Sequence, residues 1–143
     1  MYERQITPVI AAAAGYAFSR FQFRGKSLVV ILLLITQMFP LLMIIASIYK
    51  IIAGLGLLNT LTSLIVVYTA FNIPFATFLM QSFFDGIPKD LDEAAMMDGC
   101  TRLQALRKVI LPLTLPGLAA TLGFIFTAAW SELLFALMLI NSN

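Results

Sequence analysis

The chain has 143 residues, of which 61% are hydrophobic and 11% are charged, and its formal net charge is +2. A soluble domain of this length cannot bury so much apolar surface, so the composition indicates a membrane protein. The sequence has no histidine and one cysteine, Cys100. These counts exclude a disulfide within the chain and disfavour a zinc site or a serine- or cysteine-based catalytic centre. We therefore predict that the chain is not an enzyme and holds no cofactor or metal itself.

The first apolar segment, residues 6–19, lies between Arg4 and Arg20. It is too short to cross a bilayer alone, because a spanning helix needs about 20 residues. We predict that it is the end of a truncated helix. A signal peptide can begin in a similar way, but Pro8 and Gly15 flank an alanine run in place of a leucine-rich core.

Three longer segments contain no charged residue, namely those between Lys26 and Lys50, between Lys50 and Asp85, and between Lys108 and Glu132. They predict spanning helices over residues 28–49, 60–84 and 114–140. Pro40 and Pro74 lie inside two of these helices. Proline lacks an amide donor and its ring clashes with the preceding turn, so each is expected to bend or break its helix.

Lysine and arginine residues indicate the orientation of the chain, because cationic loops stay on the cytoplasmic side of a membrane. Two regions are rich in them: residues 20–26, with Arg20, Arg24 and Lys26, and residues 85–113, with Lys89, Arg102, Arg107 and Lys108. The loop between these regions carries only Lys50. We therefore predict that both basic regions are cytoplasmic, and that residues 54–59 and 141–143 face outward.

The segment of residues 85–113 contains two helix-start signals. Asp90 is followed three residues later by Glu93, and Thr101 is followed three residues later by Gln104. Both pairs have the spacing of a capping box, in which the first residue caps the helix. Two short helices are therefore predicted between the second and third spans.

Gly99 stands where the first short helix must stop and the backbone must reverse, a place where positive φ favours glycine. Pro112 is expected to limit the second short helix. On the first, Leu91, Ala94, Ala95 and Asp98 share one side and offer a small apolar surface. A membrane-surface hairpin that merely joins two spans would show the same composition.

The same segment carries a longer pattern: Glu93-Ala94-Ala95, three residues, Gly99, nine residues, Val109, one residue, and Leu111-Pro112. It resembles the EAA loop of ABC importer permeases, which have isoleucine where this chain has Val109. The resemblance implies a cytoplasmic coupling hairpin that docks into a groove of an ATP-binding cassette ATPase. The implied ATPase-coupling residues are Glu93, Ala94, Ala95, Gly99, Leu111 and Pro112, with Glu93 paired to a basic residue of the groove. Helix capping alone is the alternative role for Glu93.

Further stretches, residues 14–26, 37–40, 56–60 and 98–101, resemble the carbohydrate branch of that family, the branch of the maltose transporter's smaller permease subunit. Trp130-Ser131-Glu132 departs from the usual Trp-Asn-acid pattern at Ser131. The resemblance implies an all-α, polytopic transmembrane permease for a sugar or oligosaccharide in a bacterial or archaeal cytoplasmic membrane. Family members have six helices, so this chain is expected to be truncated at both ends. Implied partners are a second permease, two ATPase subunits that bind the ATP, and an extracytoplasmic solute-binding protein.

Polar residues inside the predicted spans are candidates for lining a substrate pathway. The candidates are Gln37, Asn72, Gln81, Ser131 and Glu132. Most polar side chains in membrane helices simply bond to neighbouring helices. Glu132 differs, because an acid at mid-bilayer is unfavourable by roughly 2.5 to 3.5 kcal/mol. Its position near the outer surface is equally consistent with an interfacial anchor beside Trp130.

Two other functions compete with the importer. An ion-coupled secondary transporter commonly places charged groups near the bilayer centre, and the central parts of these spans lack them. A non-transport membrane module could use the basic hairpin merely to dock a partner. Dependence on an ATP-hydrolysing partner separates this module from an importer.

Overall fold

The computed structural model describes residues 3–140, with the side chains of all of these except residues 3–5, 41 and 42. Residues 141–143, predicted to face outward, lie outside the described residues. Every regular element in the described part is helical, which confirms the predicted all-α class. The helices are α1 (Glu3–Arg20), α2 (Lys26–Met38), α3 (Leu41–Gly54), α4 (Leu61–Asp85), α5 (Asp90–Met97), α6 (Arg102–Ala105), the π-helical turn η1 (Leu106–Ile110), α7 (Leu111–Leu113), α8 (Leu115–Ser131) and α9 (Leu134–Leu139).

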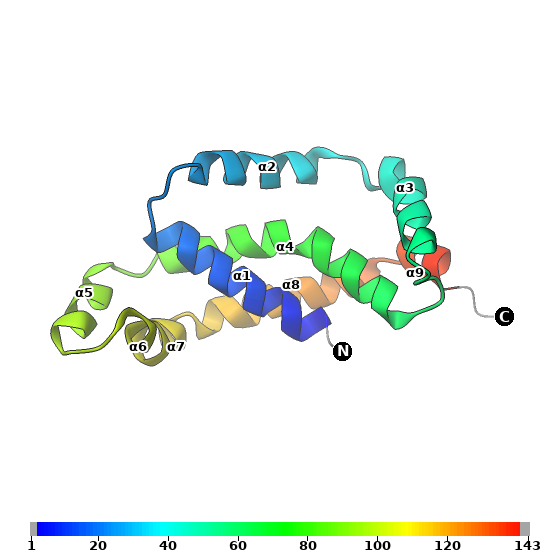
Figure 1. The fold of residues 1–143 in the computed structure, drawn as a ribbon. Coiled ribbons are helices and arrows are strands. Elements are labelled where there is room, and N and C mark those ends of the chain that lie inside the picture. The colour runs from blue at the N-terminus through cyan, green and yellow to red at the C-terminus, as the bar shows by residue number, and fades with distance from the viewer. Residues whose placement is uncertain (1–2, 141–143) are drawn as a thin grey trace.

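Helices α1, α4 and α8 form the centre of the molecule, and α2 runs along another side of α4 (Figure 1). Helices α3 and α9 lie together at one end, whereas the hairpin of α5, α6 and α7 lies at the other (Figure 1). The hairpin therefore projects from the end of the helical bundle at which α1 and α4 terminate.

Helix α4 has 25 residues and is by itself long and apolar enough to cross a membrane. Two bent helix pairs, one formed by α2 and α3 and one that ends in α8, pass the same test when each pair is taken as one span. The described residues thus contain between one and three candidate spans by length and composition.

The continuous helix expected over residues 28–49 is two helices, because the chain breaks at Phe39 and Pro40 and turns through 104°. Both residues have extended backbone, with ψ of 127° and 126°. A proline disfavours helical geometry in the residue before it and removes one amide donor, which explains the break. Pro74, by contrast, lies within the uninterrupted α4.

The helix expected over residues 114–140 is also divided. Helix α8 ends at Ser131, and Glu132 has φ −90° and ψ 108° before α9 begins at Leu134. At the other end of α8, the helical segment Arg102–Leu113 meets it at 69°. Residues 132–133 carry no proline or glycine, so this break was absent from the sequence prediction.

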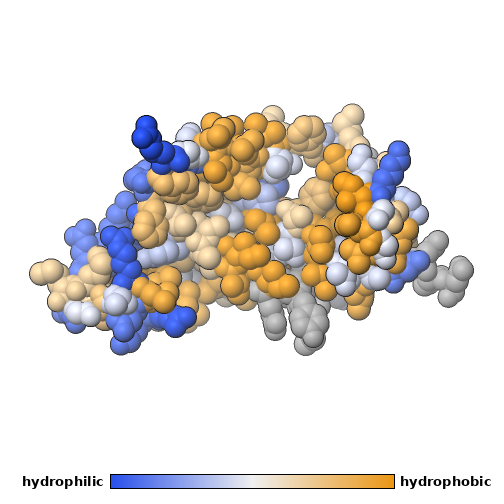
Figure 2. All heavy atoms as spheres, in the orientation of Figure 1, coloured by the Kyte–Doolittle hydropathy of each residue, from blue (hydrophilic) through white to orange (hydrophobic). Residues whose placement is uncertain are grey.

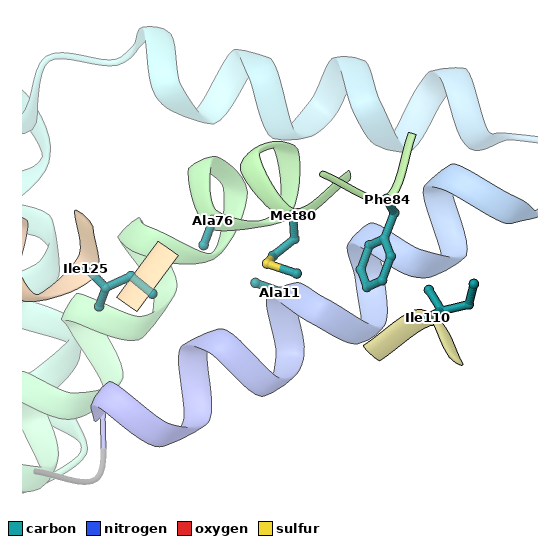
Figure 3. Packing of buried hydrophobic residues seen from close by; sticks show 6 residues of the cluster. All are labelled: Ala11, Ala76, Met80, Phe84, Ile110 and Ile125. Atoms are coloured by element: carbon teal, nitrogen blue, oxygen red, sulfur yellow. The ribbon is translucent and has the colours of Figure 1, made fainter. Parts of the chain in front are cut away.

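The central core is a cluster of six buried side chains that joins α1, α4, η1 and α8 (Figure 3): Ala11, Ala76, Met80, Phe84, Ile110 and Ile125. Helices α1 and α4 approach closely at Gly15, where an added Cβ would lie 2.8 Å from the Cβ of Met80. The ring of Phe84 lies near Ile110 (Figure 3), so the core extends from the central bundle to the base of the hairpin.

A second buried cluster joins α3, α4 and α9 and consists of Ile52, Val67, Tyr68, Phe135 and Leu139. Helix α2 contributes no buried residue to either cluster. Apolar residues cover much of the middle of the face in Figure 2, whereas hydrophilic residues gather at the end formed by the hairpin. This distribution separates a polar hairpin from an apolar body.

Candidate functional site

The first helix of the hairpin, α5, begins without a side-chain cap. Lys89 occupies the N-cap position with helical φ and ψ, and its side chain makes no capping hydrogen bond. The predicted capping by Asp90 is therefore wrong, because Asp90 already lies inside the helix. The chain enters through a turn in which the Leu91 amide donates to the Pro88 carbonyl at 3.3 Å and the Asp92 amide donates to the Lys89 carbonyl at 3.0 Å. The backbone is already helical at Lys89, one residue before Asp90, so Asp90 cannot be the cap.

The corner between the two short helices is a Schellman motif, in which a left-handed residue ends the helix. Gly99 has φ +85°, as its place in the sequence predicted. The Cys100 amide donates to the Ala95 carbonyl at 3.0 Å, and the Gly99 amide donates to the Met96 carbonyl at 3.1 Å. These two bonds satisfy carbonyl groups at the end of α5, so the turn is closed by the backbone itself.

The second short helix begins with the capping box that the sequence predicted. The Thr101 amide donates to Oε1 of Gln104 at 2.9 Å, and the Gln104 amide donates to Oγ1 of Thr101 at 3.4 Å. The helix then widens into η1, where the Leu111 amide donates to the Leu106 carbonyl, and continues through Pro112 to Leu113. It thus extends past the proline that was expected to limit it.

The residues of the predicted coupling set do not all face outward. Glu93, Ala94, Gly99 and Pro112 are exposed, Leu111 is half-buried, and Ala95 is buried with 6% of its surface exposed. Ala95 therefore packs inside the hairpin. The large exposed apolar side chains of α5 and α6 are Leu91 (37%), Met97 (89%) and Leu103 (57%).

An ion pair that the sequence did not predict joins the hairpin to α1. Nε of Arg20 lies 2.7 Å from Oδ2 of Asp92, and the two side chains are only 5% and 15% exposed. In the sequence, Arg20 indicates only the topology of the chain, and Asp92 carries no signal of its own. The two residues are far apart in the chain, so no local pattern could have paired them.

The structure distributes the candidate pathway residues over different places. Gln37 lines an apolar cavity of about 580 Å³ between α2, α3 and α4, and its Nε2 donates to the Phe71 carbonyl at 3.4 Å. Gln81 lines another cavity beside the loop before α2, and its Nε2 donates to Asp85 at 3.4 Å. Ser131 is exposed at the end of α8. These three residues are not brought together.

Asn72 and Glu132 do share a small cavity, of about 110 Å³, between α4 and the junction of α8 and α9. Nδ2 of Asn72 donates to the Tyr68 carbonyl at 2.9 Å, within its own helix. The Glu132 carboxylate accepts from the Tyr68 hydroxyl at 2.9 Å and from the amides of Leu134 and Phe135 at 3.0 to 3.2 Å. Glu132 thus caps α9 and fastens it to α4, a role that was not predicted.

The apolar helical body with its candidate spans and its polar hairpin is typical of a membrane-embedded protein. The model of one family, "Binding-protein-dependent transport system inner membrane component", matches residues 6–143. The chain belongs to this family.

Curated relatives agree with the family match. The chain is 41% identical to the sulfoquinovosyl glycerol transport system permease protein SmoH of Agrobacterium fabrum, over 96% of this chain and 48% of the relative. It is 41% identical to the trehalose/maltose transport system permease protein MalG of Thermococcus litoralis, over 92% of this chain and 48% of the relative. These names confirm the resemblance to the carbohydrate branch of the family. The chain spans about half the length of the curated relatives it matches.

A solved structure shows the same fold. The chain superimposes with a TM-score of 0.73 and 27% identity on one chain of a bacterial ABC transporter involved in the import of the acidic polysaccharide alginate. The match covers 99% of this chain and 52% of that one. The predicted permease-like helical fold is therefore confirmed.

Proposed function

We propose that the chain acts as a transmembrane permease subunit of an ATP-driven importer for a sugar or oligosaccharide. In this proposal the hairpin of α5, α6 and α7 is cytoplasmic and docks on an ATP-binding cassette ATPase, whose closure drives alternating access. A second permease, two ATPase subunits and an extracytoplasmic solute-binding protein complete the assembly. In this proposal the ATP is hydrolysed by the ATPase subunits.

The observation that carries the coupling role is the shape of the hairpin. The Gly99 corner ends the first short helix, and the Thr101 capping box starts the second. Both helices project from the apolar body (Figure 1). Their exposed Met97 and Leu103 side chains lie among charged residues. An exposed apolar patch with a polar rim is typical of a protein interface, and the Gly99 corner and the Thr101 capping box give this hairpin a defined shape.

The substrate class rests on the relatives. SmoH and MalG are named for a sulfoquinovosyl glycerol system and a trehalose/maltose system, and the permease SugB of Mycobacterium tuberculosis, 42% identical over 94% of this chain, is named for trehalose. All three names describe glycosides. We therefore propose a glycoside as the substrate, and leave Asn72 and Glu132 as the candidate pathway residues that share a cavity.

Membership of a family of binding-protein-dependent systems favours the importer over an ion-coupled secondary transporter. A membrane docking module remains the competing function, because its hairpin would also bind a partner. An ATPase requirement for uptake distinguishes the two.

The test is co-purification in mild detergent of the chain with candidate ATPase subunits from the same genome, together with sugar uptake in reconstituted vesicles. Glu93→Lys inverts an exposed charge on α5 and is expected to weaken ATPase binding. Arg24→Glu inverts an exposed charge in the loop before α2, outside the hairpin, and serves as the control. We expect Arg24→Glu to bind like the unmodified chain. An ATPase that binds Glu93→Lys as well as the unmodified chain would contradict the coupling role of this face.

A further inference from the structure

Arg20 is the last residue of α1, and its guanidinium group lies in the space between α1 and the hairpin. Besides the 2.7 Å contact with Asp92, its terminal nitrogen donates to the Ile87 carbonyl at 3.0 Å. Asp92 belongs to α5, and Ile87 belongs to the connection between α4 and α5. One side chain therefore holds both the first hairpin helix and the segment that leads into it.

The residue before Arg20 makes a parallel contact. Oγ of Ser19 donates to Oδ1 of Asp85 at 2.6 Å, and Asp85 is the last residue of α4. Ser19 is buried. The carboxyl ends of α1 and α4 are thus joined to each other directly beside the point where the hairpin begins.

The residue after Arg20 reaches the second short helix. The guanidinium carbon of Arg102, the first residue of α6, lies 5.5 Å from the ring centroid of Phe21, within cation–π range. Tyr16, Arg20, Asp92 and Arg102 together line a cavity of about 140 Å³ at this junction. The end of α1 therefore contacts both helices of the hairpin.

A buried ion pair is a contact whose loss has a large effect on stability. Removal of one partner leaves an uncompensated buried charge, whereas an exposed pair contributes little. The chain itself connects the hairpin only to α4 and α8, through residues 86–89 and the kink at Thr114. The Arg20 contacts add a third connection, to a helix that the hairpin does not follow in sequence.

We propose that Arg20 and Asp92 are positioning residues that make α1 move with the hairpin, so that a displacement of the hairpin by its partner reaches α1 as well as α4 and α8. This inference rests on the proposed coupling function. Helix α1 is closely packed on α4 at Gly15, so a movement of its end is transmitted along the bundle. Breaking the pair leaves the outer face of α5 in place and removes the ion pair that joins α1 to α5.

The first test measures docking and transport separately in the complete transporter, for Arg20→Ala and Asp92→Ala. Both variants are expected to retain the ATPase on co-purification and to hydrolyse ATP. Substrate uptake per ATP hydrolysed should fall, because ATP hydrolysis would continue while α1 no longer follows the hairpin. Arg24→Ala removes an exposed charge from the loop that follows Arg20, and Asp90→Ala removes one from the helix of Asp92; both should leave this ratio unchanged.

The charge-swapped double variant, Arg20→Asp with Asp92→Arg, is expected to recover a large part of the uptake lost in either single variant. Such a recovery would follow only from direct pairing. Unchanged uptake per ATP in both alanine variants would overturn the proposal. Loss of ATPase docking in Arg20→Ala would also overturn it, because the pair would then only fold the docking face.

A second measurement needs no ATPase, and so separates this proposal from the proposed function. Cys100 is the single cysteine of the chain and lies next to the corner of the hairpin, whereas Ala13 is exposed on α1. With spin labels at Cys100 and at Ala13→Cys, the distance distribution in membranes should be narrow in the unmodified chain and broad after Arg20→Ala. A distribution that stays narrow after Arg20→Ala would overturn the positioning role, whatever the docking result.

Discussion

The backbone of Gly15 in α1 lies directly against Met80 in α4. A Cβ at position 15 would stand 2.8 Å from the Cβ of Met80 and 2.8 Å from the amide nitrogen of Gln81. Real Cβ atoms do not approach so closely, and a backbone atom cannot move aside as a side-chain tip can. The close packing of α1 on α4 therefore requires glycine at this position.

Gly15→Ala is consequently expected to destabilise the protein by about 1 to 3 kcal/mol, the usual cost of overpacking. The sign is informative, because alanine is otherwise the better helix former by about 1 kcal/mol. Gly123→Ala is the matched control, since Gly123 lies inside α8 with no atom within 4 Å of an added Cβ. Melting temperatures in mild detergent check both variants. Equal stability of the two would mean that α1 and α4 do not pack this closely.

Gly99 has a different requirement, because the space around it is open and only its backbone angle is unusual. Its φ is +85°, and no atom lies within 4 Å of an added Cβ. Left-handed backbone costs a residue with a Cβ roughly 1 to 2 kcal/mol, and asparagine tolerates it better than most. We expect ATPase binding to decrease in the order glycine, Gly99→Asn, Gly99→Ala, Gly99→Val, with the hairpin helices progressively less stable. A Gly99→Val variant that binds like the unmodified chain would show that the corner is not needed.

The parts of the hairpin that were predictable from sequence are those formed by neighbouring residues. The hydrogen bonds at Gly99 and between Thr101 and Gln104 join residues three to five positions apart. Residues so close in the sequence are also close in the structure. Asp90 and Glu93 have the same spacing, but the turn that begins at Pro88 makes the backbone helical one residue before Asp90. The local pattern thus predicted correctly that a helix exists here, but it placed the start of the helix at the wrong residue.

The parts that were not predictable depend on residues that are distant in the chain. Helices α2, α3 and α4 lie between Arg20 and Asp92 in the chain, and in the sequence each of the two residues looks like an ordinary charge near a loop. The break at Glu132 depends likewise on Tyr68 in another helix, which supplies a hydrogen bond to the carboxylate. Gln37, Gln81 and Ser131 belong to three different helices, α2, α4 and α8. The polarity of these residues does not specify how the helices pack.

The capping box at the start of α6 gives a local prediction. Thr101→Ala removes the side-chain oxygen that accepts from the Gln104 amide, and loss of such a cap costs about 0.5 to 2 kcal/mol. Thr101→Ser keeps an acceptor in the same place and should cost much less. Because α6 is only four residues long, the effect should appear as faster hydrogen exchange in residues 101–106. Equal exchange rates in the two variants would show that the cap is dispensable.

The last prediction concerns Glu132, which was expected to be either a pathway residue or an interfacial anchor. Its carboxylate accepts from two amides at the start of α9 and from the Tyr68 hydroxyl. Hydrogen bonds to charged groups contribute about 1.5 to 3 kcal/mol, so Glu132→Gln and Tyr68→Phe should both lower the melting temperature. If the bond between the two side chains is responsible, the double variant should lose less than the sum of the single losses.

A substrate contact would produce a different pattern. Glu132→Gln would then raise the KM for uptake while the melting temperature stayed unchanged, and Tyr68→Phe would act independently. Asn72 lines the same small cavity but bonds within its own helix, so Asn72→Ala tests the cavity without breaking the connection between α4 and α9. A raised KM in Asn72→Ala together with reduced stability in Glu132→Gln would separate the two roles: the cavity would meet the substrate, and Glu132 would hold the helix that encloses it.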